Sequence, residues 1–169
     1  MVAPEVISPL TPADAFVVKS LHEQAFGPGR FARTAYRVRE GCALEDRLCL
    51  KVELSGALAG AIHFAPIEIG GRGGALLLGP LAIAPQFVNQ GWGLKLILEG
   101  ARRGAELGYE LILLVGDLPY YARARFSQVP MGRIRLPGPV DPARLLWVEL
   151  APGAFARYSG DVRGLPRPL

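Results

Sequence analysis

The residues best suited to binding chemistry lie between Gly79 and Phe126. An apolar segment ending Leu81-Ala82-Ile83-Ala84-Pro85 leads through a loop to Gln90-Gly91-Trp92-Gly93, where an amphipathic helix is predicted to begin. Glycines let the backbone approach a ligand closely, and the first N–H groups of a helix have no intrahelical partners. The helix dipole adds a preference for negative charge. The pattern therefore indicates either an anion-binding turn or a tight turn that simply precedes a helix.

Two common phosphate-binding motifs do not occur in the sequence. It contains neither the GxGxxG spacing of dinucleotide-binding turns nor the lysine pattern of a Walker loop. Any anion site at residues 90–93 is therefore of neither of these two types.

Two segments together resemble the GNAT superfamily of N-acetyltransferases. Leu-Gly-Pro-Leu-Ala-Ile-Ala-Pro at 78–85, followed by Gln-Gly-Trp-Gly at 90–93, is similar to the acetyl-CoA-binding motif of that family. Tyr-Tyr-Ala-Arg-Ala-Arg-Phe at 120–126 resembles its aromatic-Tyr-x-x-x-Gly-Phe element. The resemblance covers about residues 48–126 and continues more loosely to Leu150, where it is similar to one bacterial subfamily of predicted acetyltransferases.

The resemblance implies a fold and a mode of coenzyme binding. The fold is α+β, a single domain with a mixed, mostly antiparallel sheet, flanking helices and a splayed central strand pair. Backbone groups of Leu81, Ala82 and Ile83 would bond the pantetheine arm and polarise the thioester carbonyl. Main-chain N–H groups of the following six residues would wrap the pyrophosphate: Gln90, Gly91, Trp92, Gly93, Leu94 and Lys95.

The resemblance also implies direct attack of a substrate amine on the thioester, without an acyl-enzyme. Tyr121 lies five residues before Phe126, where the family places the acid that protonates the leaving thiolate. A phenol suits this role because its ordinary pKa of about 10 keeps it protonated at neutral pH. The alternative is that Tyr120 and Tyr121 only pack.

The general base is not defined by the sequence. His63 and Glu68 lie five residues apart on one predicted strand and so face opposite sides, which allows at most one of them to face a given site. A partly buried structural histidine is the alternative for His63. His22 and Glu23 are predicted to lie on the surface of the first helix.

Two residues depart from the family pattern. Lys95 stands where the motif has Gly or Ala, so its side chain would either block the site or pair with the pyrophosphate. Arg125 replaces the glycine before Phe126, which predicts an altered local backbone because that glycine often adopts positive φ. Arg123 or Arg125 would reach CoA phosphates, unless both are solvated surface charges.

The hydrophobic periodicity predicts the elements that must position these residues. Helices are expected over 11–26, 30–40, 91–107 and 120–126, with Gly108 following the third as a helix-ending glycine. Strands are expected over 48–54, 57–69, 75–84, 111–115, 133–136 and 145–150, with the apolar 75–84 segment central. Ser55-Gly56 and residues 70–74 are predicted turns, and the Pro-, Gly- and Arg-rich tail from about 151 is predicted to cover the surface.

Composition places these elements in one domain spanning 1–169. Nineteen basic residues against fifteen acidic ones give a net charge of +4, too dispersed along the chain to predict nucleic-acid binding.

Cys42 and Cys49 do not form a zinc framework with two histidines, so no metal is expected. Residues 73–94 are uncharged but contain prolines and amides unsuited to a membrane span. Without a secretory signal at the N-terminus, we expect cytoplasmic localisation.

The sequence therefore predicts an acetyl-CoA-dependent N-acetyltransferase acting on a primary amine of a small molecule or protein. The alternative is a catalytically degenerate CoA-binding or interaction module of the same fold. Four aromatic residues of the N-terminal region, Phe16, Phe26, Phe31 and Tyr36, line an acceptor pocket in one interpretation and pack in the core in the other. A homodimer through C-terminal strands is a further expectation.

Overall fold

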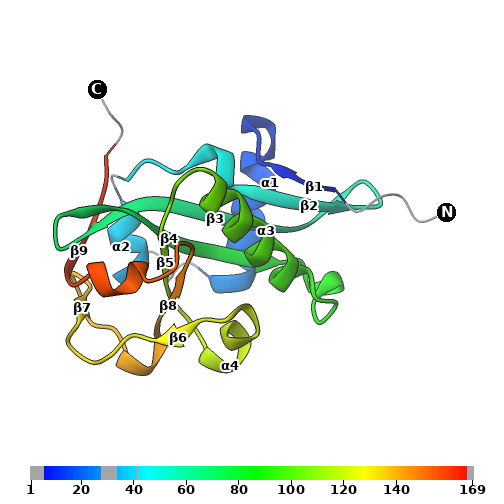
Figure 1. Cartoon of the computed structure of the whole chain (residues 1–169). Coiled ribbons are helices and arrows are strands. Elements are labelled where there is room, and N and C mark those ends of the chain that lie inside the picture. The colour runs from blue at the N-terminus through cyan, green and yellow to red at the C-terminus, as the bar shows by residue number, and fades with distance from the viewer. Residues whose placement is uncertain (1–5, 28–33, 41, 167–169) are drawn as a thin grey trace.

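The computed structural model describes residues 6–27, 34–40 and 42–166 (Figure 1). The predicted end of the first helix at 27–29, the start of the second at Arg30 and the side chain of Phe31 fall wholly or partly outside these residues.

One mixed sheet organises the described part of the chain. Its strands run in the order β1-β2-β3-β4-β5-β8-β6, with β9 pairing with β3 and β7 with β9. Neighbours are antiparallel except for β4–β5 and β7–β9. The strands are β1 (Val6–Pro9), β2 (Leu50–Leu54), β3 (Ala57–Ile69), β4 (Arg72–Ile83), β5 (Leu111–Val115), β6 (Ser127–Gln128), β7 (Ile134–Arg135), β8 (Leu145–Glu149) and β9 (Gly160–Gly164).

Helices cover both faces of this sheet. The α-helices are α1 (Ala15–Phe26), α2 (Thr34–Arg39), α3 (Trp92–Glu106) and α4 (Leu118–Tyr121). Short 3-10 turns occupy Pro12–Asp14, Asp46–Leu48, Pro85–Phe87, Ala122–Ala124, Pro142–Arg144 and Ala154–Arg157. Alternate side chains of β4 point to opposite faces, so Leu76 and Leu78 pack in the α3 layer whereas Ala75 and Leu77 pack in the other. The predicted α+β architecture is confirmed.

Local patterns predicted several elements closely and missed others. The predicted 57–69 and 111–115 strands match β3 and β5, and β4 is central as expected. The strand expected from Leu48 begins instead at Leu50, because Glu45 starts a 3-10 turn in which Leu48 N donates to the Glu45 carbonyl. The turn expected over 70–74 is confined to two glycines, and β4 begins at Arg72. Strands β1 and β6 were not predicted.

The central pair β4 and β5 diverges. The two strands are parallel and pair only over Ala75–Leu77 and Leu111–Leu113. Beyond Leu77, β4 continues for six residues beside β3 alone, to Ile83. The predicted splayed pair is therefore present, and the β5-facing backbone edge of β4 lies open beyond this point.

The C-terminal segment is part of the core, so the prediction that it only covers the surface is wrong. β9 pairs antiparallel with the end of β3. Tyr158 is fully buried, and Phe155 stacks on Trp147 of β8 with ring centroids 3.7 Å apart. The Tyr158 hydroxyl lies 2.8 Å from both the Gly73 carbonyl and a carboxylate oxygen of Glu110. A few large side chains thus tie a Gly- and Pro-rich segment to β4 and β8.

Tyr158→Phe tests this anchoring. The substitution keeps the ring but removes the hydroxyl that lies 2.8 Å from the Gly73 carbonyl and the Glu110 carboxylate, so we expect a loss of about 1 kcal/mol in the free energy of unfolding. Urea denaturation of wild type and variant measures the difference. Arg157→Gln, which removes only an exposed ion pair to the same Glu110, is the matched control and should change stability less. Equal effects of the two substitutions would contradict a core role for Tyr158.

Candidate active site

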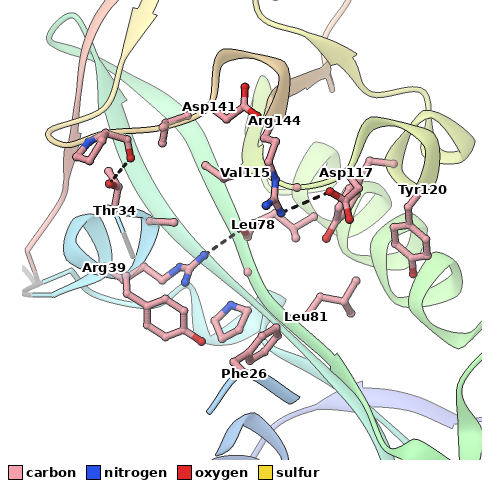
Figure 2. A pocket seen from close by; sticks show the side chains of 18 residues that line it. Phe26, Thr34, Arg39, Leu78, Leu81, Val115, Asp117, Tyr120, Asp141 and Arg144 are labelled. Atoms are coloured by element: carbon pink, nitrogen blue, oxygen red, sulfur yellow. Dashed lines mark hydrogen bonds and ion pairs between the residues drawn. The ribbon is translucent and has the colours of Figure 1, made fainter. Parts of the chain in front are cut away.

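The divergence of β4 and β5 opens a cavity of about 590 Å³. Its floor comes from the end of β4 (residues 78–81) and its opposite wall from Val115, Gly116 and Asp117 after β5. Figure 2 shows that Arg39 of α2 and Tyr120 of α4 enter this cavity from opposite sides. We call it the splay cavity. It is bounded by both central strands and by segments far apart in the sequence.

A second cavity, of about 370 Å³, lies at the N-terminus of α3. We call it the helix cavity. Gly91 has φ +85 and caps α3 without a side-chain hydrogen bond, so the first N–H groups of the helix have no side-chain cap. Tyr120 lines both cavities, and a Cβ on Gly93 would collide with its hydroxyl. The two cavities therefore adjoin at Tyr120, and glycine at position 93 permits that close approach.

The structure brings most of the predicted coenzyme-binding residues to these two cavities. Leu81 lines the splay cavity, and five others line the helix cavity: Ile83, Gly91, Trp92, Gly93 and Leu94. Ala82 lies between Leu81 and Ile83 with its methyl group buried against α1. Gln90 and Lys95 line neither cavity. Gln90 is exposed, and its amide donates to the Gln86 carbonyl at 3.4 Å.

Lys95 is exposed on α3 and leaves the helix cavity open. Its ammonium nitrogen lies 4.3 Å from the centroid of the Trp92 ring, a cation–π arrangement. Trp92 is itself a lining residue. The lysine is thus held beside the cavity by the aromatic ring rather than inside it.

Tyr121 faces the splay cavity, as does Tyr120. Their rings meet edge to face with centroids 5.0 Å apart, and Tyr121 meets Phe126 in the same way at 5.7 Å. Burial raises the pKa of Tyr121 to about 12, so its hydroxyl stays protonated throughout the neutral range. Tyr121 is therefore packed against two aromatic rings and also lines the splay cavity.

Arg125 does not alter the local backbone as its replacement of glycine had predicted. It adopts φ +68, the left-handed conformation that glycine favours, and its N–H donates to the Ala122 carbonyl at 3.0 Å. The arginine is exposed and lines neither cavity, whereas Arg123 lines the helix cavity. The turn before Phe126 thus keeps a left-handed residue, and Arg125 adopts this conformation at an energetic cost that glycine would not have.

The two histidines lie together and line neither cavity, although His63 contacts the backbone of Pro80, which lines the splay cavity. His63 is largely buried, and desolvation lowers its pKa to about 4, so the imidazole is neutral at pH 7. His22 lies 5.3 Å from it in an edge-to-face contact, with Nε2 buried, so its predicted surface position is wrong because α1 packs on the sheet here. Neither His63 nor Glu68 lines a cavity, and the structure places neither as a base.

Sequence reasoning missed four charged residues of the splay cavity. They are Arg39, Asp117, Asp141 and Arg144. Asp117 and Arg144 form an ion pair at 3.6 Å on the exposed rim. Arg39 is partly exposed as a residue, but Nε and Nη1 of its guanidinium are buried. Nη2 donates to the Leu78 carbonyl at 3.4 Å, and desolvation lowers the guanidinium pKa to about 10. No local pattern marks these residues, because tertiary packing alone brings α2 and the 141–144 turn to β4.

The predicted aromatic pocket is formed in part. Phe26 and Tyr36 line the splay cavity. Phe16 is 79% exposed and belongs neither to the cavity nor to the core, so both interpretations of this residue are wrong.

Comparison with known proteins gives relatives that are described as acetyltransferases. The Escherichia coli protein described as "Uncharacterized N-acetyltransferase YhbS" is 27% identical over 117 residues, covering 69% of this chain and 70% of that protein. The crystal structure of YhbS in complex with CoA superimposes with a TM-score of 0.82 at 24% identity, covering 98% and 93% of the two chains. A GNAT family acetyltransferase from Brucella melitensis, in complex with acetyl-CoA, gives 0.71 at 26% identity over 96% of each chain. In fold and in sequence, this chain is therefore similar to GNAT-family N-acetyltransferases.

Three further findings concern family models, metal sites and membrane-spanning helices. No protein-family model matches this chain. Its described residues include no group of three or more His, Cys, Asp or Glu side chains placed to hold a metal ion. In the same part of the chain, no helix combines the length and apolarity needed to cross a membrane.

Arg125→Gly tests the backbone strain in the turn before Phe126. Glycine adopts positive φ without the Cβ clash, so we expect the variant to be more stable than wild type by roughly 1 kcal/mol. Thermal or urea unfolding measures the gain. Arg123→Gly, two residues away in a 3-10 turn with ordinary φ, is the control and should destabilise the protein. A loss of stability in Arg125→Gly would show that the arginine side chain outweighs the strain.

Proposed function

We propose that this chain is an N-acetyltransferase that transfers the acetyl group of acetyl-CoA directly to a primary amine. The observation that carries the proposal is the junction of two cavities at Tyr120, one at the uncapped N-terminus of α3 and one between the diverging strands. Such a junction suits a ligand with an anionic end and a reactive end. Its relatives with bound CoA or acetyl-CoA support this choice of ligand.

The coenzyme would lie across both cavities. The pyrophosphate would accept hydrogen bonds from N–H groups of residues 91–94, where the helix dipole favours negative charge. Arg123 lines the same cavity and would add a positive charge. The pantetheine arm would then follow the open edge of β4 along Leu81–Ile83 and bring the thioester into the splay cavity.

The reaction would proceed by direct attack. The neutral amine of the acceptor forms a new N–C bond to the thioester carbonyl carbon, and the C–S bond breaks. Backbone N–H groups on the open edge of β4 would stabilise the negative charge that develops on the carbonyl oxygen. Tyr121 would give its proton to the departing thiolate, and the amine proton would leave through water in the cavity.

Lys95 would support binding rather than obstruct it. Its ammonium lies on the Trp92 ring, outside the helix cavity but beside its wall. A positive charge in this position attracts the phosphates of CoA without occupying their space.

Calorimetric titration of acetyl-CoA tests the binding site and the role of Lys95. We expect the wild-type protein to bind with a Kd in the micromolar range (about −8 kcal/mol), and Lys95→Gln to bind a few-fold more weakly because a long-range attraction is lost. Lys19→Gln, which removes an exposed lysine from α1, is the matched control and should leave the Kd unchanged. If the wild-type protein did not bind acetyl-CoA and Lys95→Gln did, the lysine would be blocking the site and the non-catalytic alternative would hold.

Tyr121→Phe tests the proposed general acid. We expect turnover, followed as acceptor-dependent release of free CoA thiol, to fall about 100-fold because the thiolate must then leave without a proton donor. The affinity for acetyl-CoA should stay the same. Tyr109→Phe is the control, because the Tyr109 hydroxyl donates to Glu45 and the residue lines neither cavity. Full turnover by Tyr121→Phe would remove this residue from the mechanism.

A further inference from the structure

Arg39 is a buried cation whose charge the described part of the chain does not neutralise. Its side chain extends from the last residue of α2 toward β4, and Nε and Nη1 are both buried without a hydrogen-bond partner among the described residues. Its one hydrogen bond there is the long contact of Nη2 with the Leu78 carbonyl. The Tyr36 ring lies 4.9 Å from the guanidinium carbon and supplies only a cation–π contact.

The ionisable groups that act on Arg39 are not anions under ordinary conditions. They are Tyr36, Tyr121, Cys42 and His63. Phenols and thiols are ordinarily protonated at neutral pH, and the lowered pKa of His63 leaves its imidazole neutral there. The two carboxylates of the cavity are engaged elsewhere, since Asp117 pairs with Arg144 and Asp141 accepts from the Ala143 N–H. Residues 28–33, which precede α2 in the sequence, contain no Asp or Glu.

A buried charge is retained in proteins when it is paired, and here the open side of Arg39 is the splay cavity. Figure 2 shows the guanidinium pointing into this cavity beside Leu78, on the side opposite Tyr120. A side chain on Gly79 would meet Nη2 at 2.6 Å, so this glycine leaves the space that Arg39 occupies. The guanidinium of Arg39 is therefore placed to bind a singly charged anion in the splay cavity.

The position of Arg39 relative to the reacting groups identifies which molecule supplies that anion. Tyr120 lines both cavities and so marks the end of the splay cavity from which the thioester would enter. Arg39 reaches in from α2 at the other side, with Thr34 and the 139–140 segment. A molecule contacting both sides therefore has its amine near the thioester and its negative charge at Arg39.

We propose that Arg39 binds the carboxylate of the acceptor, so that the amine substrate of this enzyme is an amino acid or another small amine that carries a carboxylate. This inference rests on the proposed acetyltransferase function. A single carboxylate balances the single guanidinium charge and matches its planar set of N–H donors. Arg39 is then a substrate-binding residue that selects the acceptor by charge.

Nuclear magnetic resonance of the arginine side chains tests the proposal without requiring turnover. The Nε–H signal of Arg39 in ¹⁵N-labelled protein is assigned by its loss in Arg39→Lys. The CoA-saturated protein is then titrated with N-acetylglycine, N-acetyl-β-alanine and 4-acetamidobutyrate, each beside its uncharged amide. We expect at least one acid to shift the Arg39 signal saturably and its amide to leave the signal in place.

Three results would overturn the proposal. They are no shift with any acid, equal shifts with acids and amides, or a shift that CoA alone produces and the acids do not extend. The CoA titration is a separate readout, because loss of CoA binding contradicts the proposed function whereas failure of the acids with CoA bound contradicts only the role of Arg39.

The second part of the test is steady-state kinetics with the free amines that correspond to these acetylated acids and amides. Arg39→Met should raise the KM for the carboxylate-bearing amine about tenfold or more and leave the KM for acetyl-CoA within about twofold, because a charge-assisted contact to the acceptor alone is lost. Arg37→Met, an exposed arginine on the same helix, is the matched control and should change neither KM. If Arg39→Met lost activity by the same factor on the carboxylate-bearing amine and on its uncharged amide, Arg39 would have a purely structural role.

Discussion

The short pairing of β4 with β5 is the constraint on which the rest of this structure depends. Two parallel strands that stay in register would bury every backbone group of the sheet centre and leave no room for a ligand. Here the ladder stops after Leu77 and Leu113, and the strands diverge. The open edge of β4 carries backbone groups that need partners when buried, and a bound molecule can supply them.

Packing on both faces keeps the two strands apart beyond this point. On one face α3 lies close to the sheet because Gly100 makes room for the ring of Phe64, which fixes the helix N-terminus relative to the end of β4. On the other face α2 and the C-terminal segment pack on the same strands, and Tyr158 connects β9 to the start of β4. The cavity therefore depends on packing on both faces of the sheet.

Elements with strong local patterns could be predicted from the sequence. The alternation in β3, the apolar run of β5 and the amphipathic period of α3 are local properties, and their bounds were found to within a few residues. The glycines of the α3 N-terminus were also recognisable, because close backbone approach and positive φ favour glycine. The proposed coenzyme-binding end of the site could thus be predicted from the sequence of residues 78–95.

The acceptor end could not be predicted in this way. Arg39 is one of many arginines, and nothing in its neighbourhood indicates that α2 buries its guanidinium against Leu78. Arg125 shows a second limit, because a turn held by the surrounding fold can impose left-handed φ on a residue that disfavours it. The tail was misjudged because Gly- and Pro-rich composition concealed the few buried side chains, chiefly Tyr158 and Phe155, that anchor it.

The central claim is that one molecule of acetyl-CoA bridges the α3 N-terminus and the open edge of β4. Amide hydrogen exchange with and without acetyl-CoA tests it most directly, because both contacts are made by backbone N–H groups. The account predicts that the coenzyme slows exchange in two separate segments, residues 81–83 and 91–94, and leaves β9 unchanged. Slowing confined to one of these segments, or found only elsewhere, would contradict it.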